Sequence, residues 1–223
     1  EVYFREDLAL SPRKAYIWNG VTGESEDAYG KVVITKEYAA SEEMVIHPGE
    51  TLVVDFGQNC AAVPAFEFMA KAGTKLNCRP SEILNDGNGA KSRGMDGPEG
   101  SCHRLNLRTP DTGMLLDYTF ADNKDYTTYR PHCTFYGYRF VSITADQEVR
   151  IRSIRSIPVS SITQQMETGS ITTGNKLVNQ LISNTLWGQR SNYLSVPTDC
   201  PQRNERLGWT ADTQVFAETG TFF

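Results

Sequence analysis

The chain has 223 residues, with 22 Lys and Arg against 27 Asp and Glu, and a formal net charge of −5 at pH 7. This negative charge argues against nucleic acid as a partner, because phosphate binding needs a basic face. The sequence has no run of about 18 apolar residues, so we expect no membrane-spanning helix and no membrane partner. The length suits one large domain or two small ones with a buried core.

Neither end of the sequence has the features of a natural chain end. The chain opens on Glu1 without an initiator Met or a signal peptide, and it stops at Phe223 in an apolar stretch without a helix C-cap. We therefore expect a piece of a larger protein. The composition agrees with a secreted or periplasmic protein, so a periplasmic or extracellular location is our hypothesis.

Short apolar runs bounded by Gly, Pro, Asn and Asp follow residues 1–30, which show no pattern that we can assign. Several of these runs alternate apolar and polar residues, which favours strands with one buried face. Turn signals recur about every eight to twelve residues, as in an antiparallel sandwich. We expect a β-sandwich domain over residues 1–158, with strands in the segments 32–34, 44–46, 51–56, 65–69, 138–144 and 149–157.

A long segment of this domain, residues 84–113, is rich in Gly and poor in apolar residues. Long loops inside compact domains are usually functional or mobile. Asp86 and Asn88 resemble the start of a calcium loop, but the later ligands and the closing Glu of that motif are missing. We expect a flexible surface loop, with a role in covering the functional site as the alternative.

The apolar pattern changes to helical spacing after a polar connector at residues 159–169. Apolar residues then recur at this spacing in the segment 177–186, which predicts an amphipathic helix. We expect the N-cap of this helix at Thr172 or Thr173 and its end near Asn192.

A second helix is predicted over residues 204–218. Its apolar residues Leu207, Val215 and Phe216 are the expected core positions. The two helices give a second domain over residues 170–223. The predicted fold class is therefore mainly β, an antiparallel β-sandwich followed by two α-helices.

The cysteines and histidines show no spacing typical of a metal site. We expect most of the cysteines to be buried apolar residues, and we expect neither a metal nor another cofactor. Cys200 has no His nearby in the sequence, so we expect no thiol nucleophile. The five cysteines lie at positions 60, 78, 102, 133 and 200, and the three histidines at 47, 103 and 132.

One segment near the C-terminal end, residues 199–212, carries three carboxylates, two arginines and a tryptophan. On the predicted second helix, Glu205, Trp209 and Asp212 are spaced i, i+4 and i+7 and project from one face. Asp199 precedes them in an extended stretch set by two prolines. Neighbouring carboxylates would favour the protonated form of Glu205, which suits a general acid. The alternative is an acidic helix start with a solvated salt-bridge face.

Four motifs precede this segment in the sequence. They are Val-Asp-Phe-Gly-Gln-Asn at 54–59, Ala-Gly-Thr at 72–74, Arg-Pro-Ser-Glu-Ile-Leu at 79–84 and an aromatic stretch at 129–141. Together with the acidic segment they resemble bacterial α-L-rhamnosidases of glycoside hydrolase family 78. The ordered set is specific, and it covers roughly residues 45–223. One position departs from the family, because the residue before the acidic Glu is usually Asp and here is Asn204, which still suits a helix N-cap.

The resemblance implies that the two helices begin an (α/α)6 barrel and that the protein is an inverting α-L-rhamnosidase acting on rhamnose-containing glycosides or polysaccharides. It implies that Glu205 is the general acid. It also implies that Asp199, Arg203 and Asp212 hold the sugar hydroxyls. Trp209 would form an aromatic wall against the deoxysugar. The opposing base in the family is a Glu further along the barrel, so we expect it outside these residues.

Arg206 is expected to form an ion pair that holds the carboxylates in place. Two other functions stay open. One is a carbohydrate-binding or interdomain module without catalytic activity, in which Phe135, Tyr136 and Tyr138 of the sandwich bind sugar. The other is a different inverting hydrolase with the same barrel. The helices lack barrel partners, so we expect them to pair with a second copy or to pack onto the sandwich.

Overall fold

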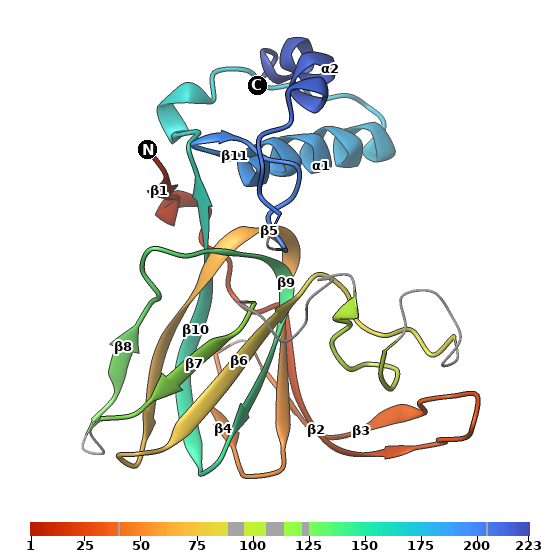
Figure 1. The fold of residues 1–223 in the computed structure, drawn as a ribbon, viewed down its shortest axis with the longest axis vertical. Helices are drawn as coiled ribbons and strands as arrows, with labels where there is room; N and C mark the ends of the chain where they lie inside the picture. Colours follow the sequence, from red (N-terminus) through yellow and green to blue (C-terminus); the bar gives the residue numbers. More distant parts are fainter. Residues whose placement is uncertain (40, 89–95, 106–113, 122–124, 204) are drawn as a thin grey trace.

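The computed structural model describes residues 1–39, 41–88, 96–105, 114–121, 125–203 and 205–223. Figure 1 shows a curled antiparallel sheet with two helices beyond one of its ends, which confirms the predicted fold class. Within the described residues, ten strands form the sheet and β11 pairs with β12 in a separate hairpin. The strands are β1 (Tyr3–Phe4), β2 (Lys14–Thr22), β3 (Lys31–Tyr38), β4 (Met44–Ile46), β5 (Thr51–Ala70), β6 (Lys75–Ser81), β7 (Leu116–Thr119), β8 (Thr127–Tyr129), β9 (Tyr136–Ala145), β10 (Val149–Ser160), β11 (Tyr193–Leu194) and β12 (Val196–Pro197).

The long strand β5 is the centre of the sheet, since β2, β8, β9 and β10 all pair with it in antiparallel register. The sequence predicts two strands here, at 51–56 and 65–69, whereas the structure has one strand of 20 residues. The register between β5 and β9 shifts between Asp55 and Cys60. The residues that read as a turn therefore form a bulge within one strand, which bends the strand without ending it.

The sheet curls around the core, and alternate residues of the long strands point into it. Val54 and Phe68 of β5 and Ile143 of β9 are fully buried, and each such side chain stabilises the fold by about 1.5–3 kcal/mol. Tyr136 and Tyr138 of β9 also belong to this core, with exposed fractions of 5% and 0%. These two rings do not form the sugar-binding surface that the module hypothesis requires.

The N-terminal residues, which the sequence left unassigned, complete the sheet. β1 pairs with the last residues of β10, and β2 pairs with both β3 and β5. A short 3-10 helix (Glu6–Leu8) lies between β1 and β2. The pairings of β1 with β10 and of β2 with β5 join residues far apart in the sequence, so a local pattern does not reveal them.

The described parts of the 84–113 loop pack onto the sheet. Asn85 and His103 are only 3% and 2% exposed. The prediction of a surface loop is therefore wrong for these two residues, whereas residues 86–88 are exposed. Residues 89–95 and 106–113 lie outside the described residues.

The first helix, α1 (Lys176–Asn192), lies across one end of the sheet and contacts β5 and β10 (Figure 1). It ends where the sequence predicts. Its N-cap is Asn175, whose Oδ1 accepts the N–H of Leu177 at 2.9 Å. The predicted caps Thr172 and Thr173 are wrong, because an Asn at the last extended position satisfies the free N–H groups first.

The second helix, α2 (Thr210–Gly220), lies on the side of α1 away from the sheet (Figure 1). It begins later than predicted. Its predicted core positions are also wrong for this chain, since Leu207 and Val215 are exposed and Phe216 is half-buried. Among the described residues, no helix is both long and apolar enough to cross a membrane.

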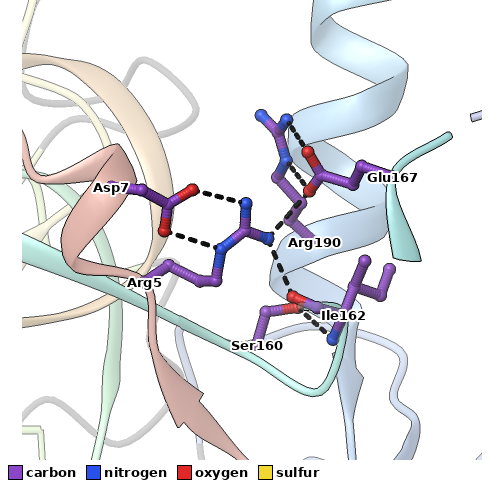
Figure 2. A network of polar contacts seen from close by, with 6 residues as sticks. All are labelled: Arg5, Asp7, Ser160, Ile162, Glu167 and Arg190. Carbon is purple, nitrogen blue, oxygen red and sulfur yellow. Dashed lines mark hydrogen bonds and ion pairs between the residues drawn. The ribbon is translucent and has the colours of Figure 1, made fainter. Parts of the chain in front are cut away.

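A network of charged side chains joins the N-terminal segment to α1 (Figure 2). Arg5, whose side chain is 4% exposed, forms ion pairs of 2.8 Å with both Asp7 and Glu167. Glu167, in the connector after a second 3-10 helix (Gln164–Met166), accepts two hydrogen bonds of 2.7 Å from Arg190 of α1. The charges alternate in sign, so each buried charge has an opposite partner. The network fixes α1 relative to the sheet.

Candidate functional site

The acidic segment forms a loop whose two ends are held together. Thr198 bridges Gly208 in an isolated antiparallel pair, and the N–H of Asp199 donates to the carbonyl oxygen of Leu207 at 3.3 Å. We call residues 199–207 the carboxylate loop. Because its ends are joined, the side chains between them lie close together without a helix.

The carboxylate loop packs directly against the sheet. A Cβ atom on Gly137 of β9 would lie 2.6 Å from the backbone nitrogen of Gln202, so only Gly allows the observed approach. Arg206 donates to the carbonyl oxygen of Phe135 at 2.8 Å, and its guanidinium lies 3.9 Å from the centre of the Phe135 ring. It also donates to two carbonyl oxygens of the loop itself. The predicted ion pair of Arg206 is therefore wrong, and this side chain docks the loop on the sheet.

Inside the loop, Arg203 joins two carboxylates. Its guanidinium lies 3.3 Å from Asp199 and 2.6 Å from Glu205, and these three side chains are 16–23% exposed. Burial alone would raise the pKa of Asp199, but the hydrogen bonds from Cys200 and Arg203 outweigh it and hold that pKa below its usual value. Asp199 is thus ionised at neutral pH. The predicted carboxylate neighbour Asp199 lies within 4.8 Å of Glu205, and the structure adds a cation, Arg203, that contacts both.

The predicted helical face of Glu205, Trp209 and Asp212 does not form. Asn204, the predicted start of the helix, lies outside the described residues, and Arg206 has a left-handed φ of 47°, which a helix does not accommodate. Glu205 therefore belongs to the loop. Trp209 is the N-cap residue of α2, and Asp212 lies in its first turn.

A cavity of about 330 Å³ lies between α1 and α2. Asp199, Trp209 and Asp212 are among the residues that line it, whereas Glu205 is not. Glu205 is connected to this cavity through Arg203, which contacts Asp199. The structure thus brings three of the predicted site residues to one cavity and holds the other two beside it.

Three polar residues of α1 that the sequence analysis did not assign to the site also line this cavity, namely Thr185, Gln189 and Asn192. These residues are spaced i, i+4 and i+7, so they form a polar stripe on one face of the predicted helix. This spacing could have identified them from the sequence. Oε1 of Gln189, Oδ1 of Asn192 and Oδ1 of Asp199 are buried, and within the described part of the chain none of these oxygens accepts a hydrogen bond. An unpaired buried acceptor costs about 1–3 kcal/mol. The cavity therefore suits a ligand with several hydroxyl donors.

The loop also places ligand atoms of Asp199, Cys200 and Glu205 within 4.8 Å of one another. Arg203 already supplies a positive charge to both carboxylates. Burial and the neighbouring Asp199 raise the pKa of the Cys200 thiol to about 11, so it is protonated at neutral pH. This arrangement fits neither a metal ion nor a thiol nucleophile.

Comparisons with known proteins agree with this fold. The bacterial α-L-rhamnosidase concanavalin-like domain family matches residues 46–160, and the bacterial α-L-rhamnosidase six-hairpin glycosidase domain family matches residues 166–223. The chain belongs to the bacterial α-L-rhamnosidase family. The second match begins just before α1 and includes the whole carboxylate loop.

Relatives in this family are much longer than the chain. An α-L-rhamnosidase of Streptomyces avermitilis is 33% identical over 214 residues, which are 92% of this chain and 19% of the relative. An α-L-rhamnosidase of Formosa agariphila is 32% identical over 191 residues, 85% of this chain and 19% of the relative. The chain therefore spans about a fifth of the length of these curated α-L-rhamnosidases.

Solved α-L-rhamnosidase structures have the same fold. The Streptomyces avermitilis enzyme in complex with L-rhamnose matches 99% of this chain and 18% of its own, with 27% identity and a TM-score of 0.64. The native Aspergillus terreus enzyme matches 80% of this chain and 19% of its own, with the same identity and TM-score. At this identity, both comparisons support the family assignment as well as the fold.

Proposed function

We propose that this chain is the part of an inverting α-L-rhamnosidase that carries the general acid, Glu205, and one wall of the rhamnose site. Asp199, Arg203 and Asp212 hold the sugar hydroxyls in this proposal. Trp209 packs against the apolar face and methyl group of the deoxysugar. The base that activates water lies outside these 223 residues.

The single observation that carries the proposal is the set of unpaired buried oxygens beside the carboxylate loop. Asp199, Gln189 and Asn192 line the cavity between the helices, and each has one buried oxygen that accepts no hydrogen bond from the described residues. The hydroxyls of a sugar ring are donors that such oxygens accept. A cavity of about 330 Å³ is at the lower end of the range for small-molecule sites, which suits one monosaccharide.

The ion pair between Arg203 and Glu205 affects the protonation of the general acid in this mechanism. Inverting hydrolysis needs an acid that protonates the leaving oxygen while a base activates water on the opposite face of the ring. We propose that Arg203, which has several N–H donors, turns from Glu205 toward the sugar hydroxyls when substrate binds. Its departure removes the cation beside Glu205, which favours the protonated form that a general acid needs. The rhamnose complex of the Streptomyces avermitilis relative supports rhamnose as the sugar.

Product analysis with the full-length polypeptide that contains this sequence tests the proposal. We expect it to hydrolyse an aryl α-L-rhamnoside and not the matched aryl α-D-mannoside or α-L-fucoside. Proton NMR of the reaction should detect β-L-rhamnose as the first product, before mutarotation. Formation of α-L-rhamnose first would contradict inversion, and hydrolysis of the other glycosides alone would contradict the rhamnose assignment.

A further inference from the structure

The bulge in β5 fixes the first of the sequence motifs, residues 54–59, in one conformation. Asp55 accepts the N–H of Gly57 at 2.7 Å and two hydrogen bonds of 2.7 Å from Arg139 of β9. Gly57 has a φ of +78°, and a Cβ there would lie 2.0 Å from the side chain of Arg13. The bulge therefore requires both the Asp and the Gly of the motif.

The bulge directs the last two residues of the motif out of the β5 ladder. Nδ2 of Asn59 donates to Oε1 of Glu82 at 2.9 Å, and Nε2 of Gln58 donates to the carbonyl oxygen of Asn59 at 2.8 Å. Glu82 follows β6 directly and belongs to the motif at 79–84. Two motifs that the proposed chemistry does not use thus meet at the end of the sheet that faces α1 (Figure 1).

Their side chains line a second cavity, of about 420 Å³, between the sheet, α1 and the carboxylate loop. Gln58, Asn59 and Glu82 line it from the sheet, and Trp187 lines it from α1. It shares Asp199, together with two residues of α1, with the cavity between the helices. The two cavities are therefore neighbours with Asp199 at their boundary.

The lining of this second cavity is suited to another hydroxylated group. Its amides donate and accept hydrogen bonds, and its carboxylates accept from hydroxyls. The half-buried Trp187 adds an aromatic surface for C–H groups. Because Glu82 and Asp199 are acidic, an anionic group is disfavoured here. This combination matches a sugar better than a phosphate or a purely apolar group.

We infer that the second cavity binds the leaving group of the rhamnoside, that this leaving group is a sugar, and that Asn59 and Glu82 of the sandwich hold its hydroxyls. This inference rests on the proposed function. The scissile bond would then lie at the boundary of the two cavities, beside Asp199 and the Arg203–Glu205 pair. The β-sandwich would contribute to substrate choice as well as to the support of the helices.

Two substrates that share rhamnose and differ in the leaving group test the inference. The full-length polypeptide is assayed on a disaccharide of α-L-rhamnose linked to glucose and on p-nitrophenyl α-L-rhamnoside. Asn59→Ala and Glu82→Gln should each raise KM for the disaccharide about tenfold, the loss expected for one hydrogen bond to a bound polar group. KM and kcat for the aryl substrate should change less than about twofold.

Gln147→Ala is the matched control, because this exposed amide lies in the turn between β9 and β10, away from both cavities. It should leave both substrates unchanged. Glu82→Gln keeps the size of the side chain, and thermal unfolding of each variant identifies any loss of folding. Equal losses on both substrates, or no loss on either, would overturn the leaving-group assignment while the proposed function stands. A wild-type enzyme that cleaves neither rhamnoside would overturn the proposed function and this inference together.

Discussion

Arginine side chains fix the loops around the site at the level of single residues. Arg203 joins Asp199 to Glu205, and Arg206 docks the carboxylate loop on Phe135. Arg139 holds the β5 bulge through two hydrogen bonds to Asp55. In each case a planar guanidinium binds two or more oxygens at once, which Lys does not reproduce. The geometry of the site therefore depends on these arginines as much as on the carboxylates.

The pair of Asp55 and Arg139 gives a pH-dependent prediction. Burial alone would raise the pKa of Asp55, but the hydrogen bonds from Arg139 and the Gly57 N–H outweigh it, so the pKa is lowered on folding. A lowered pKa stabilises the fold above the unfolded value of about 3.9, and this stability is lost as the pH falls through the folded value. We expect Asp55→Asn to lower the free energy of unfolding by about 1–3 kcal/mol at pH 7.

Urea unfolding of the 223-residue chain at pH 7 and near pH 3 measures this effect. The difference between wild type and Asp55→Asn should shrink at the lower pH. Glu67→Gln is the control, because its partner Arg152 is 54% exposed and such pairs contribute less than about 1 kcal/mol. The same loss at both pH values would show that the charge of Asp55 is not what stabilises the bulge.

At the scale of elements, the sequence predicts what depends on local pattern. The end of α1 at Asn192 and the change from strands to helices are confirmed, and all predicted strand segments lie in strands, although 51–56 and 65–69 are parts of the single strand β5. The predicted start of α2 is wrong because the backbone of Arg206 has a left-handed φ, which a helix does not accommodate. In this conformation the Arg206 side chain contacts Phe135, a residue of the sandwich. The polar stripe of α1 was missed because its importance depends on α2 lying opposite. The domain limits at residues 158 and 170 stay a prediction.

The ion pairs of Arg5 are the clearest example of contacts that a local sequence pattern does not reveal. Its partner Glu167 lies far along the chain, and Arg190 lies further still (Figure 2). Burial alone would raise the pKa of Glu167, but hydrogen bonds from Arg190 and Arg5 outweigh it and lower this pKa. Glu167 is therefore ionised at neutral pH and holds both arginines.

Removal of Arg5 should release α1 from the sheet. Arg5→Met leaves Glu167 and Asp7 with one cation fewer, and breaking a buried pair in this way typically costs about 3–5 kcal/mol. We expect a marked fall in the midpoint of thermal unfolding, followed by circular dichroism. Arg152→Met removes an exposed pair of similar length and should have little effect. Equal shifts for both variants would contradict the anchoring role of Arg5.

At the scale of the whole molecule, the helices expose apolar side chains. Leu177 and Val215 are 82% and 84% exposed. Such surfaces usually mark contacts with further structure or with another molecule. Pairing with a second copy stays a prediction, and a concentration-dependent mass in analytical ultracentrifugation would support it.

The 223-residue chain by itself should have no measurable α-L-rhamnosidase activity. In an inverting site the two carboxyl groups face each other across roughly 6.5 to 9.5 Å. Asp199 and Glu205 instead contact the same guanidinium, so they lie on one side of the site. Incubation with an aryl α-L-rhamnoside should give only background hydrolysis. Turnover by this chain that disappears with Glu205→Gln would contradict the assignment of the base to another part of the protein.

We propose that Glu205 protonates the leaving oxygen. The measurement that tests it most directly is the dependence of turnover on the leaving group, in the full-length polypeptide with Glu205→Gln and with Glu218→Gln, an exposed residue of α2, as control. We expect Glu205→Gln to lower kcat by about 10²–10⁴-fold on an alkyl rhamnoside, whose leaving group needs the proton, and far less on an activated aryl rhamnoside. Glu218→Gln should change neither rate. An equal loss on both substrates with Glu205→Gln would contradict the role of general acid and leave Glu205 as a binding or structural residue.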